Sequence, residues 1–564
     1  SRAREPLPWH AMVAWRLCLC ALAASAPPRA AAAAEAEEAV CRAGEQCAGP
    51  GGASGAPYFW PSARGDVGRY GVSPYAVPTD LEANFSWKYY HPRGQYSTIA
   101  LGCVIDDKKN VYLSAHDAIS KLSPDGKLIW SQTSEKTAMT IPTVPALKDG
   151  RLFGSTHDGH IFALSMETGE PVWATRVANE VAGDTSFVTV HDGIVVAGAD
   201  STQGERNARV FGLNATDGSP LWTFKPDAAV WNFMALFPDD GTFVFQDLFG
   251  RAYRCNLADG SLIWKAGGHP DTWTDGTLML GPRGSVYGVT VHGPLFKCAL
   301  RFMWPDDCKG SLTQYSLSDG RVIFNKTFPR PTNIFPAVGR LSEGAGLSVV
   351  MPIGQQAGMP VVAMTLIART LGAVAGLVLA MALLAIRCLW SCRSSLREPS
   401  AKAAVRSALR GGVALLAGAA LGVALMSLVT LWLFQKTPVY EAEVLALDAE
   451  TGEEQWRFEL PPWVAFHTAG DPEGLALRHS LGSRQLCIPN PFSAPTIGPD
   501  GTIYLGFQDG KLYAIRDANR DGVIDAKTEV STYATGTAFS SPGAAFAPGM
   551  LAIANCDGLF VFKH

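Results

Sequence analysis

Short apolar runs alternate with glycine-containing turns along most of the chain, and one such unit recurs many times. A clear copy starts at Arg151 and ends at Trp173, with turns at Asp158-Gly159 and Thr168-Gly169. Apolar runs of this length between turns predict β-strands, and glycine supplies the positive φ that tight hairpins require. A unit that returns at a regular period indicates a repeat architecture.

An aromatic residue closes each copy of the unit. The closing positions are Trp87, Trp130, Trp173, Trp222, Trp264, Phe324, Trp456 and Tyr533, and the first four intervals are 43, 43, 49 and 42 residues. This period suits four short strands, so we expect eight four-stranded units. The last unit, from Gly549, ends before an aromatic of its own. Residues 85–90 are expected to supply its missing strand and to close a ring that has no free sheet edge.

The segment from Asp448 to Trp456 carries an Asp, a Thr-Gly pair and a Trp at the spacing DxxTGxxxW. It resembles the docking motif of pyrroloquinoline-quinone-like (PQQ-like, or quinoprotein) repeats, and the resemblance covers about residues 80–350 and 438–564. It implies an all-β fold, an eight-bladed quinoprotein-like β-propeller, in which each Trp packs on a glycine of the next blade. The implied docking residues are Trp87, Trp130, Trp173, Trp222, Trp264 and Trp456.

Two long apolar segments, residues 359–386 and 411–434, interrupt the array. Each is long enough to cross a bilayer as a helix. The residues between them, 387–410, carry six basic side chains and one acid, so this loop is expected to be cytoplasmic and both propeller portions to lie on the other side. Arg369 is expected at the membrane interface and not as an intramembrane functional charge, because seventeen uncharged residues follow it.

A membrane hairpin returns the chain to the side that it left, so a blade can continue after it. We expect the outer strand of that blade at residues 347–351 and its continuation at 439–447, which makes the transmembrane hairpin an insertion inside one blade. Small residues should let the two helices approach closely. These residues are Gly372, Ala375, Gly376, Gly412, Gly418 and Gly422.

Residues 1–34 have the features of a secretory signal peptide. Met12 and Arg16 precede a short apolar run, and a stretch of small residues follows it. The apolar run is too short to span a bilayer. Residues 35–79 are expected to form a flexible segment. The signal and the basic loop together place the propeller in the lumen of the secretory pathway or at the cell surface.

Three sequons and eight cysteines agree with that compartment. Potential N-glycosylation sites begin at Asn84, Asn214 and Asn325. The eight cysteines outside the signal and the membrane region are an even number, as disulfides in an oxidising compartment require. Two local bridges are expected, Cys41 with Cys47 and Cys298 with Cys308.

The other cysteines leave alternatives open. Three pairings are allowed for the set Cys103, Cys255, Cys487 and Cys556. One hypothesis joins Cys103 in the first blade to Cys556 in the last, which would pin the closure of the ring. At the cytoplasmic membrane edge, Cys388 and Cys392 are either palmitoylated or free reduced thiols.

An aspartate-rich turn is the sharpest candidate for ligand binding. Residues 517–525 place oxygen donors at positions 1, 3, 5 and 9 and a glycine at position 6, which is the spacing of a calcium-binding loop. The candidate ligands are Asp517, Asn519, Asp521, Val523 and Asp525. Thr528 stands at the twelfth position in place of a bidentate Glu, so reduced affinity is expected. The alternative is a polar surface turn.

The sequence favours binding over catalysis. The formal net charge of −4 argues against the basic surface of a nucleic-acid-binding protein. The chain contains no nucleophile elbow, P-loop or dinucleotide fingerprint. It also lacks the adjacent cysteines and the haem motif of quinoprotein dehydrogenases, so PQQ is not expected. His157 and His160 flank a turn and are expected to face solvent and not to bind a metal.

We therefore expect a two-pass membrane glycoprotein whose propeller is a binding or assembly platform, with calcium as the candidate cofactor. A protein partner is expected at the loops 298–308 and 461–491, because inserted loops offer contact surfaces on a rigid scaffold. The alternative is a membrane-bound, PQQ-dependent oxidoreductase that acts on alcohols or sugars. A lumenal sensor is disfavoured, since the loop at 387–410 is too short to hold an effector domain.

Overall fold

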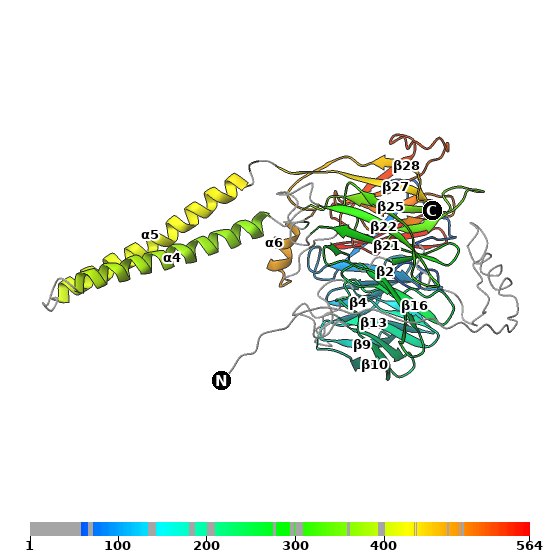
Figure 1. Ribbon diagram of the computed structural model, residues 1–564, viewed down its shortest axis with the longest axis horizontal. Helices are drawn as coiled ribbons and strands as arrows, with labels where there is room; N and C mark the ends of the chain where they lie inside the picture. The colour runs from blue at the N-terminus through cyan, green and yellow to red at the C-terminus, as the bar shows by residue number, and fades with distance from the viewer. Residues whose placement is uncertain are drawn as a thin grey trace, which may run out of the picture.

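Strands arranged in eight blades form a propeller, from which one pair of long helices projects (Figure 1). The computed structural model describes residues 58–564 apart from 66–70, 134–142, 180–185, 200–208, 275–277, 294–297, 299–307, 358–360, 393–400, 434, 436, 471–472, 484–486 and 488–489. The expected signal peptide at 1–34, with Cys41 and Cys47, lies outside the described residues.

The first four blades follow one another along the chain. Blade 1 comprises β2 (Ala100–Ile105), β3 (Val111–Ala115), β4 (Ala118–Leu122) and β5 (Leu128–Thr133). Blade 2 comprises β7 (Ala146–Lys148), β8 (Arg151–Ser155), β9 (His160–Ser165) and β10 (Pro171–Arg176). Blade 3 comprises β12 (Thr189–His191), β13 (Ile194–Ala199), β14 (Arg209–Asn214) and β15 (Pro220–Phe224). Blade 4 comprises β16 (Thr242–Gln246), β17 (Arg251–Asn256) and β18 (Leu262–Gly267), and a bridge from Leu236 to Val244 takes its innermost place.

The last four blades contain the inserted segments. Blade 5 comprises β20 (Leu278–Gly281), β21 (Ser285–His292), β22 (Lys309–Ser316) and β23 (Val322–Phe328), with β19 (Thr272–Trp273) paired to β21. Blade 6 comprises β24 (Ala337–Gly339), β25 (Ser348–Gly354), β27 (Ala442–Asp448) and β28 (Glu454–Glu459). Blade 7 comprises β30 (Thr496–Ile497), β31 (Ile503–Gly506), β32 (Lys511–Ile515) and β33 (Val530–Ala534). Blade 8 comprises β34 (Ala545–Ala547), β35 (Met550–Asn555), β36 (Gly558–Lys563) and β1 (Phe85–Tyr90). Two short pairs lie between blades: β6 (Thr143–Val144) with β11 (Ser186–Phe187), and β26 (Val439–Tyr440) with β29 (Trp463–Val464).

The ring closes as the repeat pattern predicts. Strand β1 pairs antiparallel with β36, in a register that places Phe85 opposite Phe562 and Tyr90 opposite Gly558. Blade 8 therefore takes three strands from the C-terminus and its outermost strand from the N-terminal part of the chain. This closure pairs the last sheet and leaves the ring without a gap. The eight-bladed β-propeller expected from the closing aromatics is confirmed.

Five tryptophans, each in the outer strand of a blade, form the same hydrogen bond with the next blade. The five Nε1 donors and carbonyl acceptors are Trp87 to Pro124 (2.8 Å), Trp130 to Met166 (3.2 Å), Trp173 to Ala215 (3.1 Å), Trp222 to Leu257 (2.7 Å) and Trp264 to Leu317 (2.7 Å). In each case the ring covers a glycine of the neighbouring hairpin, where a Cβ would strike it; for Trp130 this glycine is Gly169. Close packing therefore requires glycine at these turns, in addition to the positive φ.

The other three closing aromatics use different contacts. The ring of Phe324 covers Gly452 without a donor group. Tyr533 stacks on Phe85, with ring centroids 4.9 Å apart, across the closure of the ring. Trp456 belongs to the same buried cluster as Ile524, which lies within the longer turn at 517–525. The junctions of blade 6 with blade 7 and of blade 7 with blade 8 thus keep an aromatic contact but lack the repeated glycine turn.

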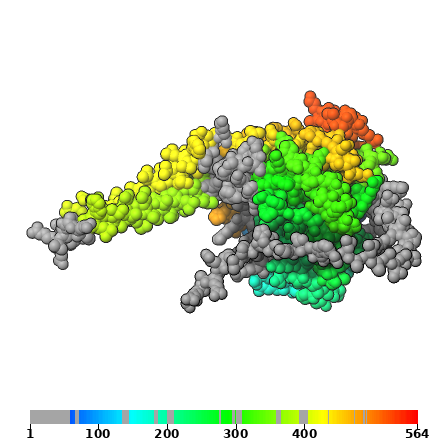
Figure 2. All heavy atoms as spheres, viewed as in Figure 1, coloured from blue at the N-terminus to red at the C-terminus, as the bar shows by residue number. Residues whose placement is uncertain are grey.

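The helices α4 (Val361–Cys392) and α5 (Ala401–Leu433) lie between β25 and β27 of blade 6. They project from the propeller as a rod (Figure 2). The hairpin is therefore inserted within one blade, but the expected outer strand at 347–351 is wrong. Strand β25 is the second strand from the axis in blade 6. It is fully buried because neighbouring blades cover both of its faces. The helices are also longer than expected, so that Arg387, Arg406 and Arg410 lie on helical turns and not in a loop.

The two helices pack backbone to backbone at two glycine pairs. Gly372 lies against Gly422 and Gly376 against Gly418, with no space for a side chain at any of the four positions. A Cβ at Gly412, in contrast, would meet nothing, and Ala375 is exposed, so these two expected contacts are wrong. The small-xxx-small spacing on both helices permits this approach. Arg369 Nε donates to Ser427 Oγ (3.1 Å) near the propeller end of the hairpin.

Both helices are long and apolar enough to cross a membrane. The candidate spans are Thr365–Trp390 and Val405–Trp432, and 11% and 0% of their most apolar windows are buried. Large apolar side chains such as Leu371, Leu416 and Leu421 are more than 60% exposed. A helix that presents apolar side chains all round is suited to a lipid environment and not to water.

The segment before β1 departs from the expectation of a flexible segment at 35–79. Its described residues, 58–65 and 71–79, which we call the arm, enter the centre of the ring. Trp60 is 2% exposed and pairs with Ile105 through both backbone hydrogen bonds (3.0 and 2.9 Å), and Val72 bridges to Ile497. The arm is short and rich in small and polar residues, yet these contacts order its described residues.

Candidate functional site

The inserted segments gather on one face of the propeller. Because the strands of a blade alternate in direction, the turns between second and third strands lie on the same face as the connections between blades. Helices α4 and α5 and the pair Cys298 and Cys308 belong to the first group, and the described residues of 461–491 belong to the second. We call this surface the helix-bearing face; Figure 1 shows α6 (Glu473–Ser480) beside the root of the hairpin. The described residues of both loops expected to contact a partner therefore share a face with the helices.

The 461–491 segment is bound firmly to blade 8. Arg478 on α6 forms an ion pair with Asp557, and both side chains are 0% exposed. Thr537 Oγ1 (2.5 Å) and Gln95 Nε2 (3.4 Å) also donate to this carboxylate. Burial raises the pKa of Asp557, while Arg478 and the hydrogen bonds oppose that rise. The pair positions α6 and has no free acid or base for chemistry.

A disulfide holds the same segment at its other end. Cys487 bonds to Cys556, with Cα atoms 5.9 Å apart. The hypothesis that joined Cys103 to Cys556 is therefore wrong, because Cys103 is a free, buried thiol, as is Cys255. Burial raises the pKa of both thiols to about 12, which makes them unreactive. The sequence allowed this pairing but offered no signal to choose it.

The second loop is closed by the expected disulfide between Cys298 and Cys308, with an S–S distance of 2.01 Å. Both cysteines are buried in a small cluster with Trp273 and Val291. The residues between them lie outside the described part of the chain, and so does Trp304. Of the two thiols expected at the far end of the hairpin, Cys388 is free and exposed, and the side chain of Cys392 is not described. Palmitoylation stays a prediction.

The root of the hairpin is held by polar contacts on both of its chains. Gln508 accepts from the backbone N–H of Ala357 (2.8 Å) and donates to the carbonyl of Gln355 (3.0 Å). On the returning chain, Glu443 is 1% exposed and binds Arg330 (2.7 Å) and Arg457 (3.2 Å). These contacts tie the helices to the connection before blade 6 and to the turn of blade 7, so the hairpin leaves the propeller in a defined direction.

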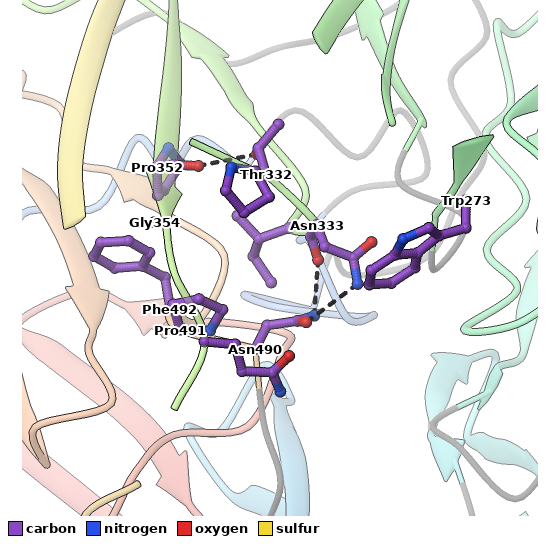
Figure 3. A pocket seen from close by; sticks show the side chains of 11 residues that line it. Trp273, Thr332, Asn333, Pro352, Gly354, Asn490, Pro491 and Phe492 are labelled. Atoms are coloured by element: carbon purple, nitrogen blue, oxygen red, sulfur yellow. Dashed lines mark hydrogen bonds between the residues drawn. The ribbon is translucent and has the colours of Figure 1, made fainter. Parts of the chain in front are cut away.

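A small hollow of about 10 Å³, which is room for one water molecule, lies at this root (Figure 3). Three prolines, Ile334 and Phe492 give it an apolar wall, and two asparagines join across it: Asn490 Nδ2 donates to the carbonyl of Asn333 (2.7 Å). The indole N–H of Trp273 is buried there without an acceptor among the described residues. Its described lining contains no ionisable side chain. The hollow is suited to holding water or a small polar group and not to acid–base chemistry.

The axis of the ring, where quinoprotein dehydrogenases hold their cofactor, is taken by the arm. Arg64 is 1% exposed and donates to the carbonyls of Pro336 (3.4 Å), Pro495 (2.6 Å) and Pro542 (3.2 Å). Trp60 packs on Phe546 with ring centroids 5.9 Å apart. A planar quinone would have to displace these side chains, so the residues present on the axis do not fit PQQ.

Histidines on the helix-bearing face do not form a metal centre. The rings of His116 and His157 stack with centroids 5.8 Å apart, so His157 packs on another side chain, whereas it was expected to face solvent. His160 Nδ1 lies 3.1 Å from a carboxylate oxygen of Asp158. Burial and the neighbouring His157 lower the pKa of His116 to about 4. Across the part of the chain that the structure describes, no group of three or more His, Cys, Asp or Glu side chains is placed to hold a metal ion.

The candidate calcium loop lies on the face opposite the helices. Gly522, at its sixth position, has φ +77°, and one oxygen of Asp517 is buried without a described donor. Asn519 and Asp521 accept backbone N–H groups of the loop itself (3.0 and 2.8 Å). Glu529 binds three further N–H groups, of which that of Asp525 contributes most to lowering its pKa. The turn has the glycine of a calcium loop, but its carboxylates are not gathered around one point as a metal site requires, so a calcium site here stays a prediction.

Of the three sequon asparagines, Asn325 is exposed and Asn84 and Asn214 are half-buried. Asn84 lies before β1, and Asn214 ends β14 on the face opposite the helices, where its side chain accepts from the backbone N–H of Thr216 (2.8 Å). Asn325 is exposed on β23, the outer strand of blade 5. Glycosylation stays a prediction at all three.

Comparisons with known proteins bear on the repeat and on the fold. Residues 115–270 match the family model described as outer membrane protein assembly factor BamB. Proteins of that name from Nitrosomonas eutropha and Yersinia pestis are both 25% identical, over 178 and 207 residues. Those alignments cover 30% and 34% of this chain and 39% and 48% of the relatives, which is less than half of either relative.

Solved structures show the same architecture. The crystal structure of quinohemoprotein alcohol dehydrogenase from Comamonas testosteroni superposes with a TM-score of 0.51 at 12% identity, over 94% of this chain and 84% of that one. A likeness at this identity concerns the fold alone. Together with the repeat match and the ring described above, these similarities identify the chain as an eight-bladed β-propeller of PQQ-like repeats, with two apolar helices inserted in its sixth blade.

Proposed function

We propose that this chain is a membrane-anchored assembly platform whose helix-bearing face binds a protein partner at the membrane surface. The observation that carries the proposal is the convergence of three insertions on that face: the helix hairpin, a loop closed by the Cys298–Cys308 disulfide, and the 461–491 segment, which a disulfide and a buried ion pair tie to blade 8. A face built from rigidly held insertions is a suitable surface for protein recognition. The relatives that match the repeat are named as assembly factors, which supports this class of function.

We further propose that the propeller lies in the lumen of the secretory pathway or outside the cell, with the far end of the hairpin in the cytoplasm. Basic residues at that end, among them Arg387 and Arg410, support this orientation. The disulfides support an oxidising compartment for the propeller. The helix-bearing face then lies against the bilayer, within reach of membrane-embedded partners.

Site-specific photo-crosslinking tests the proposal. Leu477 on α6 and Val523 on the opposite face are 44% and 66% exposed, so each can carry a photoreactive side chain without disturbing the core. We expect a defined crosslinked protein from position 477 in native membranes and none from position 523, which is the matched control. Identical crosslinking from the two positions, or none from position 477, would contradict a partner on the helix-bearing face.

A quinoprotein oxidoreductase is the weaker alternative, because Arg64 and Trp60 fill the axis where the cofactor would bind. Incubation of the purified chain with PQQ and calcium, followed by an absorption spectrum and a dye-linked assay with alcohols and sugars, separates the two functions. We expect neither a quinone band after gel filtration nor turnover. Stoichiometric bound quinone with activity would replace the platform proposal by the enzyme.

A further inference from the structure

The arm is held on the axis in the manner of a bound peptide. It makes main-chain pairs at two points: Trp60 with Ile105, and the strand-like stretch after Gly71, where the N–H of Ser73 donates to Ile497 (2.9 Å). Its aromatic anchor, Trp60, is buried against Phe546. Main-chain hydrogen bonds combined with a buried side-chain anchor are the usual means by which an extended peptide is recognised.

Arg64 is the second anchor. It stands at the tip of a tight turn, in which the N–H of Gly65 donates to Ser62 (3.0 Å). Its guanidinium donates to three carbonyls that come from blades 6, 7 and 8, just before their innermost strands. A planar group with five N–H donors in a fixed fork can satisfy several converging acceptors, which a lysine ammonium cannot do with the same geometry.

Two glycines make the space for this guanidinium. A Cβ at Gly71 would strike the Arg64 side chain, and a Cβ at Gly543 would meet both Arg64 and the carbonyl of Ala494. Both glycines have positive φ, +67° and +85°. The space for the guanidinium is thus shaped partly by the arm, at Gly71, and partly by the connection before the innermost strand of blade 8, at Gly543, which is far from Arg64 in sequence.

We propose that the axial channel is a peptide-binding site for an extended segment with an aromatic residue and an arginine four positions later, and that the arm occupies it as a tethered ligand. The assignment goes beyond the platform function and does not depend on it. Because the arm continues directly into β1, its binding is coupled to ring closure at blade 8. A free peptide of the same chemistry must compete with a ligand whose tether gives it a high effective concentration.

A cleavable arm tests the proposal in the full-length protein. A protease site introduced at Glu82–Ala83, where both residues are exposed, separates the arm from β1 in the detergent-solubilised chain. We expect the cleaved wild-type arm to stay bound through gel filtration and the Arg64→Ala arm to leave at least 10-fold faster. A Thr79→Ala arm, which changes an exposed side chain of the arm, should stay bound as long as the wild type.

Immediate loss of the wild-type arm, or equal retention of the Arg64→Ala arm, would overturn the proposal. If the Arg64→Ala chain does not fold, the cleaved wild-type protein is challenged with labelled peptides of residues 57–79, and their uptake is followed by fluorescence anisotropy. The wild-type peptide should exchange with the arm, whereas Arg64→Ala and Arg64→Lys peptides should bind at least 10-fold more weakly. Equal binding by the Arg64→Lys peptide would show that the three carbonyls do not require a guanidinium and would overturn that part of the proposal.

Discussion

Single buried side chains decide how the helix-bearing face is held. The ion pair of Arg478 and Asp557 is fully buried, so neither charge can be exposed to water when its partner is lost. Removing one member of a buried pair generally costs about 3–5 kcal/mol, because the other charge is left uncompensated. The pair was not predictable from sequence, since Arg478 and Asp557 are 79 residues apart and belong to different elements.

Arg478→Ala is therefore expected to lower the free energy of unfolding by about 3 kcal/mol. Denaturant unfolding of the solubilised protein, followed by tryptophan fluorescence, measures the change. Arg283→Ala is the control, because Arg283 pairs with Glu450 while both side chains are more than half exposed. That substitution should change stability by less than about 1 kcal/mol. A loss of the same size in both variants would show that burial of the pair is not what stabilises α6.

Because His116 is buried, we expect the free energy of unfolding to fall in acid. Its pKa in the folded chain is about 4, below the usual 6.5, so the unfolded chain takes up a proton first as the pH falls. Stability from the neutral ring is complete above pH 6.5 and is lost as the pH falls from there to about 4. His157, Asp117 and Arg478 are the charged or titratable neighbours that act on it.

His116→Gln should flatten this part of the pH profile of stability. The wild type should lose up to about 3 kcal/mol more than the variant between pH 6.5 and 4, from 1.36 kcal/mol per pKa unit. Unfolding curves at several pH values measure the difference. His269→Gln is the control, since this side chain is 66% exposed. Parallel profiles for the wild type and His116→Gln would contradict the burial of a neutral His116.

At the scale of elements, the repeat made most of the fold predictable. Each closing aromatic marks the outer strand of a blade, and five indoles form the same hydrogen bond to the next blade, so local spacing carried long-range information. Strand order inside blade 6 was harder. Strands β25 and β27 are both buried throughout, and an apolar run alone does not distinguish an inner strand from an outer one.

The hairpin depends on glycine at its crossing points. Gly376→Leu should push the helices from backbone contact toward the separation of about 8–10 Å that larger side chains impose. Spin labels at Leu371 and Leu425, both exposed, report the interhelical distance by pulsed electron resonance in nanodiscs. Gly412→Leu, where a side chain meets nothing, should leave the distance unchanged. Unchanged distances in the Gly376 variant would contradict the packing described here.

The aspartate-rich turn at 517–525 gives a prediction about calcium. At ten times its dissociation constant, calcium should raise stability by about 1.4 kcal/mol, seen as a higher melting temperature that chelator reverses. Asp517→Asn should abolish the effect, because Asp517 supplies the buried oxygen without a donor. Asp319→Asn, in a regular hairpin turn of blade 5, should retain it. A melting temperature that does not respond to calcium would leave the turn as a structural loop only.

Across the whole chain, the ring and the inserted helices were predictable from the sequence, but the arm on the axis was not. Arg64 binds carbonyls 272, 431 and 478 residues away, and backbone carbonyls leave no signature in side-chain sequence. The arm therefore resembled a flexible segment. The closing aromatics, in contrast, are side chains at regular spacing, and they predicted which segments of the chain meet at blade 8.

Because the two apolar helices interrupt a single ring, both propeller portions should lie on one side of the membrane. Impermeant maleimide labelling of sealed, cytoplasmic-side-out vesicles tests it, in a background with Cys388 and Cys392 changed to Ser. Cysteines replace Leu128 in blade 1, Val523 in blade 7 and Ser395 between the helices. Position 395 should be labelled in intact vesicles, and positions 128 and 523 should be labelled together only after permeabilisation. Labelling of 128 and 523 from opposite sides would contradict it.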